Sequence, residues 1–429
     1  MTNPSKSKRS KLGVSRRSVL AGGLAAAGST VLGAPMVWAQ SLKDIKLNHT
    51  GMSYSTLADI GRMATEDLGF EVTMSVTDHA GMTNRMINDP GAIDVADIEI
   101  WQAKVAVPQG VLQGVEISKI KNWSDLTPLY TEGVFGGKEV ARQGDSPFEF
   151  IYRDSKDSNT FATSATDFTN FVPGVYNADT LGIRPDLVGR PITSWSDLVS
   201  SDFSGRAAIQ NIPTIGIMDA MMALEASGDV TYADKGNPSQ AELSATIAKL
   251  IELKKAGHWR ALWNTFDESV NLMAAGEVVI QSMWSPAVTA VKVQGTPCVY
   301  QPLKEGYRGW GNGLGLMSHL DGLKLEAAYE YLNWYNAGRV GGFIAKQGYY
   351  SANPTSAKAA LTENERGFFY EGKAATADIT SPTGEKTNSA GDIRDGGSYE
   401  VRFGNVGVWN NLMDEAEFLF AKWNEFNAA

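Results

Sequence analysis

The stretch Ala92-Ile93-Asp94-Val95-Ala96-Asp97-Ile98-Glu99-Ile100 decides the fold that we expect for this chain. Its residues alternate with a period of two, which is typical of a β-strand, and two of its acidic residues fall on one side. On such a strand Asp97 and Glu99 point to the same face, because side chains two residues apart do so. That face is either solvated or the wall of a pocket.

The residues upstream repeat this pattern of strands separated by helices. Residues 45–48 and 70–76 are predicted to be strands. Residues 55–67 place apolar side chains on one face at helical spacing, and residues 81–87 also favour a helix. A strand–helix–strand order predicts a parallel sheet covered by helices.

The same pattern returns from about residue 160. Strands are predicted at 168–176, 206–210 and 278–283, and helices at 213–226 and 241–256. A doubled pattern in a chain of this length predicts two α/β lobes, because domains usually hold ~100–200 residues.

The pattern changes again after residue 306. A Gly-rich strand at 309–317 precedes a helix at 325–337, and the polar segment 371–398, rich in Gly, Thr, Ser and Asp, is predicted to be an exposed excursion. We assign the parts of the chain as follows: residues 40–150 to the N-terminal part of lobe 1, 151–305 to lobe 2, and 306–429 to a crossover back with C-terminal helices that pack mainly on lobe 1.

The N-terminal residues have the features of an export signal. A basic segment leads to Ser15-Arg16-Arg17-Ser18-Val19-Leu20-Ala21, an apolar run follows to residue 32, and Val37-Trp38-Ala39 ends in a small residue of the kind at which signal peptidases cut. The paired arginines resemble a twin-arginine signal. We therefore expect residues 1–39 to be a cleaved signal peptide, the twin-arginine export machinery to be a partner, and the mature protein to lie in the periplasm.

Charge and cysteine content narrow the function further. Six of the 38 Lys and Arg residues and none of the 48 Asp and Glu residues precede residue 40, so the mature chain has a net charge of −16. This net charge argues against a nucleic-acid partner, because nucleic-acid binding is dominated by basic contacts to phosphate. Cys298 is the only cysteine, so no intramolecular disulfide can form, and we expect it to be a small buried side chain.

The sequence has no catalytic or metal-binding motif, but it is rich in aromatic residues. The four histidines form no HExxH pair, and no GxSxG motif or phosphate loop occurs. Eleven Trp and fourteen Tyr are present, and several of them follow predicted strands, namely Trp101, Trp284, Trp310 and Tyr349. Ligands bind at the carboxyl ends of strands in open α/β sheets, where aromatic faces suit cations.

Six short motifs occur in a consistent order along the chain. Two of them read Ser194-Trp195-Ser196-Asp197-Leu198 and Gly348-Tyr349-Tyr350-Ser351-Ala352-Asn353. The others lie at residues 93–101, 110–122, 171–177 and 276–284. Together they resemble the solute-binding proteins of ABC importers, specifically the spermidine/putrescine-binding family.

The resemblance implies a type II periplasmic binding protein fold, with two α/β lobes that close on a ligand cleft by a hinge motion. It implies a protein that captures a small polar or cationic solute, polyamine-like or otherwise amine-containing, and delivers it to the permease subunits of an ABC transporter. From the doubled α/β pattern and the export signal we expect a monomer. It implies no catalytic residue, cofactor or metal. The ligand-binding residues that we expect are His49, Thr50, Met52, Asp97, Glu99, Trp101, Thr214, Trp284, Trp310, Asn312 and Tyr349.

The sequence departs from this family where an amine would be held. Asn312 replaces the aspartate of the W-x-D motif, and residues 211–215 contain no acid. A buried ammonium without a carboxylate partner is costly, so a monocation, a zwitterion or a neutral polar solute competes with a polyamine. Glu99 and Asp97 remain as candidate counter-charges. We therefore expect spermidine to bind weakly or not at all.

Two other functions are alternatives. Tyr349 and Tyr350, with His49 and Glu99, are residue types that bind ferric iron in some relatives of this fold. A carbohydrate-active enzyme with a Trp-lined cleft is the other alternative.

Overall fold

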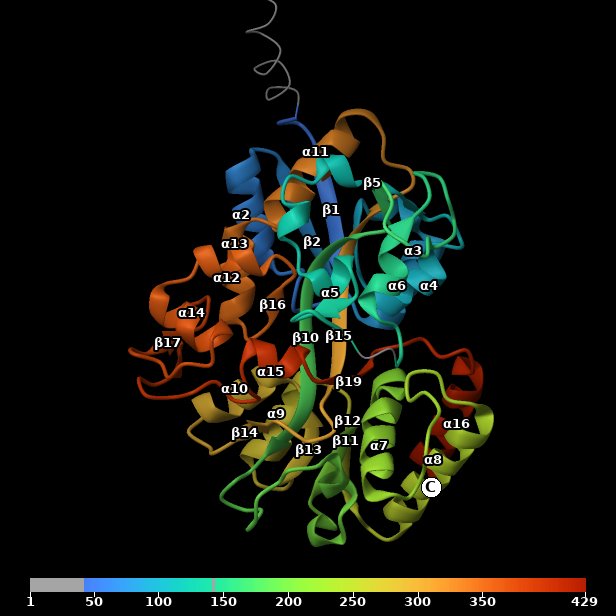
Figure 1. The fold of residues 1–429 in the computed structure, drawn as a ribbon, viewed down its shortest axis with the longest axis vertical. Coiled ribbons are helices and arrows are strands. Elements are labelled where there is room, and N and C mark those ends of the chain that lie inside the picture. Colours follow the sequence, from blue (N-terminus) through green and yellow to red (C-terminus); the bar gives the residue numbers. More distant parts are fainter. Residues whose placement is uncertain (1–41, 141–142) are drawn as a thin grey trace, which may run out of the picture.

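The structure is a computed structural model that describes residues 42–140 and 143–429. Two α/β lobes lie one above the other, and two long strands, β10 (Val172–Ile183) and β15 (Tyr307–Met317), run through both of them (Figure 1). The predicted two-lobed α/β fold is thus confirmed. The proposed signal peptide, residues 1–39, lies outside the described residues.

The sheet of the first lobe is built around β1 (Lys46–Gly51), which pairs in parallel with β2 (Glu71–Val76) and β3 (Val95–Glu99). Helix α2 (Ala58–Leu68) connects β1 to β2, buries one apolar face, and ends at Gly69, whose φ of 75° suits a residue without a Cβ. The other short elements of this part of the chain are α3 (His79–Asn88), α4 (Ala103–Ala106), α5 (Pro128–Thr131), α6 (Pro147–Ile151), β4 (Leu112–Gln113), β5 (Val115–Glu116), β6 (Val134–Phe135), β7 (Lys138–Glu139), β8 (Tyr152–Arg153) and β9 (Phe168–Thr169).

The second lobe has its own parallel strands. β11 (Ala207–Gln210) lies between β12 (Trp259–Trp263) and β13 (Ile280–Met283) and is parallel to both, while β13 is antiparallel to β10. Helix α7 (Pro213–Ser227) is buried over most of its length, as its Met- and Ala-rich sequence predicts. The remaining elements are α8 (Gln240–Lys255), α9 (Phe266–Ala274), α10 (Ser285–Val293) and β14 (Val299–Gln301).

The two crossing strands are longer than their sequence pattern predicts. β10 and β15 are antiparallel to each other, and all of their residues are buried. In the register of this pair Asn177 lies opposite Trp310, and Asp179 lies opposite Arg308. β15 also pairs with β3 on the first lobe and with β19 (Val406–Trp409). The strands therefore place polar side chains where the lobes meet.

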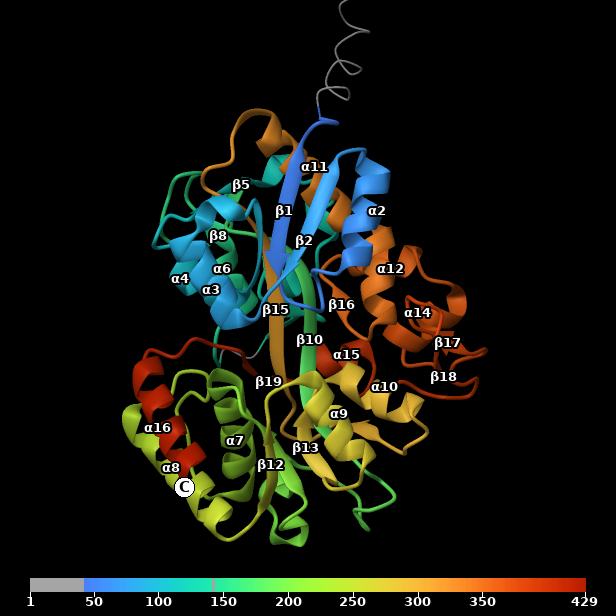
Figure 2. The ribbon, with the colours of Figure 1, turned by 180° about the vertical axis from the view of Figure 1, so that it is seen from behind.

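The helices after β15 divide between the lobes (Figure 2). α11 (Gly322–Tyr335) packs against α2 and β1, whereas the last helix, α16 (Ala416–Ala428), packs against α7 and α8 of the second lobe. Leu419, Trp423 and Phe426 of α16 belong to the core of the second lobe, which differs from the expected packing on lobe 1. The lobe boundaries at residues 150 and 305 stay predictions. The elements between these helices are α12 (Gly338–Lys346), β16 (Tyr350–Ser351), α13 (Pro354–Ala359), α14 (Glu363–Tyr370) and α15 (Tyr399–Phe403).

Residues 371–398 are more ordered than an exposed excursion. They contain a short hairpin of β17 (Ile379–Thr380) and β18 (Lys386–Asn388), and they bury Ala375 and Ile379. The prediction of exposure is therefore wrong for part of the segment. Within residues 42–140 and 143–429, no helix is both long and apolar enough to cross a membrane.

Candidate ligand-binding cleft

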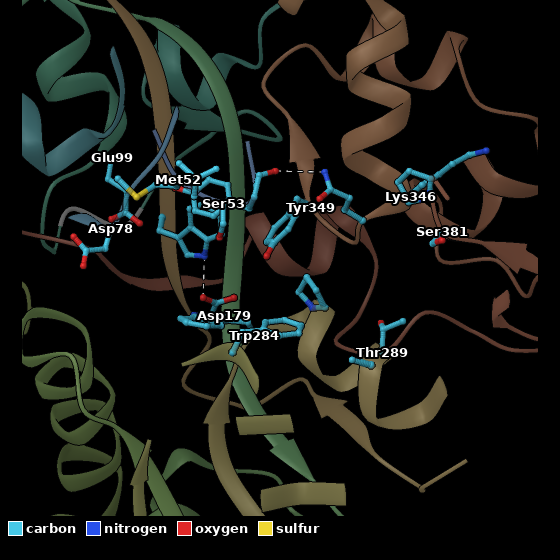
Figure 3. A pocket seen from close by; sticks show the side chains of 18 of the residues that line it. Met52, Ser53, Asp78, Glu99, Asp179, Trp284, Thr289, Lys346, Tyr349 and Ser381 are labelled. Atoms are coloured by element: carbon cyan, nitrogen blue, oxygen red, sulfur yellow. Dashed lines mark hydrogen bonds between the residues drawn. The ribbon is translucent and has the colours of Figure 1, made fainter. Parts of the chain in front are cut away.

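A cavity of about 880 Å³ lies between the lobes (Figure 3). This is within the ~300–1,000 Å³ that is usual for small-molecule sites. Its wall combines residues from the first lobe, the crossing strands, the second lobe and the segment 371–398. They include Met52, Ser53, Tyr54, Asp78, His79, Glu99, Asp179, Arg308, Trp310, Phe266, Trp284, Thr289, Lys346, Tyr349, Ser381, Glu385, Thr387 and Asn410.

Two groups of aromatic rings line the cavity. The first-lobe group consists of Tyr54, Trp310 and Tyr349, whose ring centroids lie 4.8 to 5.8 Å apart. In the second-lobe group, Trp284 packs edge-on against Trp263 at 5.0 Å and parallel to Phe266 at 6.4 Å. Trp284 lies across the cavity from Tyr349 in Figure 3. Rings on both walls can contact a cation or an apolar stem from two sides.

Tyr54 also carries a free polar group. Its hydroxyl is shielded from solvent and has no hydrogen-bond partner. Burial raises its pKa well above the usual value, and the neighbouring Glu99 and Asp97 raise it further. Buried polar groups are normally hydrogen-bonded, so this hydroxyl is available to a bound solute.

Glu99, the last residue of β3, is already paired within the protein. Its carboxylate accepts a hydrogen bond from the indole of Trp101 at 2.5 Å and lies 3.0 Å from Nε2 of His79. Burial, the largest single influence, opposes ionisation, but the charge and hydrogen bond of His79 together with the hydrogen bonds from Trp101 and Asn410 hold the pKa of Glu99 below its usual value. Burial likewise lowers the pKa of His79, and Glu99 more than compensates, so that this pKa is raised. Both shifts favour the ionised form of the pair, in which the charge of His79 balances that of Glu99.

Asp179 and Arg308 form a second buried group where the lobes meet. Asp179 accepts hydrogen bonds from Trp310 Nε1 at 2.8 Å and Tyr300 Oη at 3.0 Å. Arg308 donates from Nε to Asp219 at 2.7 Å and lies 3.4 Å from Asp179. Burial raises the pKa of Asp179 to about 6, although Arg308 opposes the shift.

Asn410 connects these two charged groups. Its side-chain oxygen accepts a hydrogen bond from Arg308 at 2.8 Å, and its amide donates to Glu99 at 3.3 Å. Polar contacts thus run without a break from His79 on the first lobe to Asp219 on α7 of the second. A buried network of this kind fixes the positions of the polar side chains on this part of the cavity wall.

Three of the predicted residues lie behind the cavity wall. Asp97 is fully buried; it accepts a hydrogen bond from the amide of Asn312 and lies 3.6 Å from His49 Nε2. The other ring nitrogen of His49 is 2.6 Å from the hydroxyl of Tyr331, and Asn312 accepts a hydrogen bond from Val175 N at 2.5 Å. The carboxylate of Asp97 is therefore already engaged by groups within the protein and is not a free counter-charge for a solute.

The structure thus divides the predicted residues into two sets. On the cavity wall are Met52, Glu99, Trp284, Trp310 and Tyr349. Away from the wall are His49, Thr50, Asp97, Trp101, Thr214 and Asn312. Trp101 donates a hydrogen bond to the wall residue Glu99, and Thr214 immediately precedes the wall residue Ile215.

Sequence reasoning missed several wall residues. His79 follows the end of the predicted strand 70–76, and that position was a usable signal because ligands gather at strand ends. Asp179 and Arg308 lie within long strands, and only the β10–β15 register brings them together. Asn410 follows β19, and no pattern in the sequence marks it as a residue of the cavity wall.

The tyrosines proposed for iron do not face one cavity. Tyr349 lines the cleft, whereas Tyr350 is fully buried in another aromatic group with Tyr176, Tyr370 and Tyr399. His49 lies behind the wall. In the part of the chain that the structure describes, no group of three or more His, Cys, Asp or Glu could hold a metal ion.

Known structures of low sequence identity share this fold. A putative spermidine/putrescine ABC transporter protein from Listeria monocytogenes has a TM-score of 0.62 at 14% identity, covering 89% of this chain and 98% of that one. The Tp0655 (TpPotD) lipoprotein of Treponema pallidum has a TM-score of 0.62 at 12% identity, covering 89% and 99%. The spermidine/putrescine substrate-binding protein PotD of Streptococcus pneumoniae has a TM-score of 0.60 at 14% identity, covering 89% and 99%.

Sequence comparison identifies the family independently of these structures. No curated protein matches the chain. The sequence profile of the bacterial extracellular solute-binding proteins, however, matches residues 62–369, which is more than half of the chain. Together with the two lobes and the cavity between them, this match shows that the chain belongs to the bacterial extracellular solute-binding protein family.

Proposed function

We propose that this protein is the extracytoplasmic solute-binding component of an ABC importer, which captures a small amine-containing cation and delivers it to the permease subunits. The observation that carries the proposal is the pair of aromatic groups on opposite walls of the cavity. Aromatic faces attract a desolvated cation, worth about 0.5–2 kcal/mol per contact. The proposal assigns binding and no catalysis to the cleft, and the protein acts as a monomer.

The two buried carboxylates of the cavity wall argue against a polyamine such as spermidine. Glu99 is paired with His79, and Asp179 is paired with Arg308 and Trp310. A solute with several primary ammonium groups needs unpaired acceptors, because a buried charge without a partner is costly. A cation with few N–H groups fits the aromatic walls better.

Mass spectrometry of the solute released from freshly purified, denatured protein tests the proposal, followed by calorimetry with that solute. We expect an amine-containing cation to be released and to bind again, and spermidine to bind weakly or not at all. Submicromolar binding of spermidine would show that the internal pairs do not disfavour polyamines. Release of a sugar or an anion would contradict the proposed ligand class.

The proposal includes export through the twin-arginine route and cleavage after Ala39, on the basis of Arg16 and Arg17. Changing both arginines to lysine is expected to leave uncleaved precursor in the cytoplasm, as seen by fractionation and immunoblotting. Normal export of that variant would instead point to the general secretion route.

A further inference from the structure

The hairpin segment, residues 371–398, is part of the cavity wall. Ser381, Pro382, Glu385 and Thr387 line the same cavity as Glu99 and Trp284. Figure 3 shows Ser381 and Lys346 on one side of the view and Glu99 and Asp78 on the other, with Tyr349 and Trp284 between them. The cavity is therefore elongated, and the hairpin segment closes the end away from Glu99.

The hairpin segment is held to both lobes. Arg394 is buried; it donates hydrogen bonds to the carbonyl oxygens of Phe369 at 2.9 Å and Gly348 at 2.6 Å. Phe369 packs in the same hydrophobic core as Met82 of the first lobe. Asp395 pairs with Lys292 of α10 on the second lobe at 2.8 Å. These contacts fix the hairpin segment at the far end of the cavity.

The two charged side chains at this far end, Lys346 and Glu385, differ in whether they have a partner. Lys346 is neutralised by Glu365, which lies 2.6 Å away. Glu385 is exposed to solvent, and in the described part of the chain its carboxylate has no hydrogen bond or ion pair. The other acids of the wall, by contrast, are engaged: Asp78 caps α3, Glu99 binds His79, and Asp179 binds Trp310. Glu385 is thus the free negative charge of the cavity wall.

We propose that Glu385 and the turn around it form a second subsite, which holds a positively charged end group of an elongated solute. The subsite makes the cleft selective for length, because a short cation held between the aromatic groups does not reach it. The hydroxyls of Ser381 and Thr387 lie on the same wall and add hydrogen-bonding groups. This inference rests on the proposed capture of a cation, and it adds the shape and the second charge of that cation.

Calorimetry with two probes tests the subsite. Tetramethylammonium is a short monocation, and decamethonium is a long cation with a charged group at each end; neither has an N–H group. In the mature protein, Glu385→Gln is expected to weaken decamethonium binding by roughly three- to tenfold, because an exposed charged contact is weaker than a buried one. Tetramethylammonium binding should not change. All measurements use one salt concentration, since exposed charges are screened.

Glu400→Gln is the matched control. Glu400 lies on α15, is exposed and is not part of the cavity wall, so this variant removes the same charge and should leave both affinities unchanged. An equal loss for both probes in Glu385→Gln, or no loss for decamethonium, would overturn the subsite alone. If neither probe binds the unmodified protein, the proposed capture of cations fails, and the subsite fails with it.

Discussion

Trp284→Ala is expected to weaken binding of the released solute by roughly tenfold or more. Trp284 supplies the large ring on the second-lobe wall, and its side chain is only partly buried. Loss of a cation–aromatic contact costs ~0.5–2 kcal/mol, to which the lost apolar contact adds, and 1.4 kcal/mol corresponds to tenfold. Calorimetry measures the dissociation constant directly.

Trp334→Ala is the control for this prediction. Trp334 packs on Tyr331, donates a hydrogen bond to Asp67 and lies outside the cavity wall. Its loss should leave affinity unchanged. Trp310→Phe is a second test on the opposite wall; it keeps a ring but removes the donor to Asp179. Unchanged affinity in both Trp284→Ala and Trp310→Phe would place the solute elsewhere.

The largest expected effect on stability comes from Arg308→Met. This variant leaves Asp179 and Asp219 buried without their cation. Breaking a buried ion pair from one side typically costs ~3–5 kcal/mol, because the remaining charge is desolvated and unpaired. Urea unfolding at neutral pH should show this loss. Arg62→Met, which breaks ion pairs on the surface of α2, should cost less than about 1 kcal/mol.

The loss in Arg308→Met should depend on pH. In the unmodified protein the folded-state pKa of Asp179 is about 6, above its value of 3.8 in an unfolded chain. The contribution of this group to stability is therefore greatest below about pH 4 and falls as the pH rises through about 6. Without Arg308 the pKa rises further, so the variant should recover part of its stability between about pH 7 and about pH 5. An identical loss at both pH values would contradict this assignment of charge.

The sequence predicts the lobes because their signals are local. Alternation marks residues 92–100 as a strand, and helical spacing marks the helix that follows β1; both patterns depend on neighbours within a few residues. The extension of β10 to Ile183 was missed, since Ala178, Asp179 and Thr180 do not look like the interior of a buried strand. They are buried because β15 and β13 pair with β10 along these residues.

The candidate site was less predictable because it depends on contacts between distant segments. Asp97 and Glu99 share a strand face, as predicted, but Asn312 of β15 covers Asp97 while Glu99 stays on the cavity wall. Asn312 takes the place of an expected ligand-binding acid and binds Asp97 and the backbone of Val175 instead. Only the β3–β15 and β10–β15 registers, which join residues more than a hundred positions apart, determine these outcomes.

Small-angle X-ray scattering of the protein without the proposed signal peptide tests the central claim most directly. The protein is first stripped of solute and then saturated with the solute that mass spectrometry identifies. Because the cavity lies between lobes joined by crossing strands, capture should close the lobes and reduce the radius of gyration. A smaller radius in the saturated protein is the predicted result. An unchanged radius at saturation would contradict capture by lobe closure.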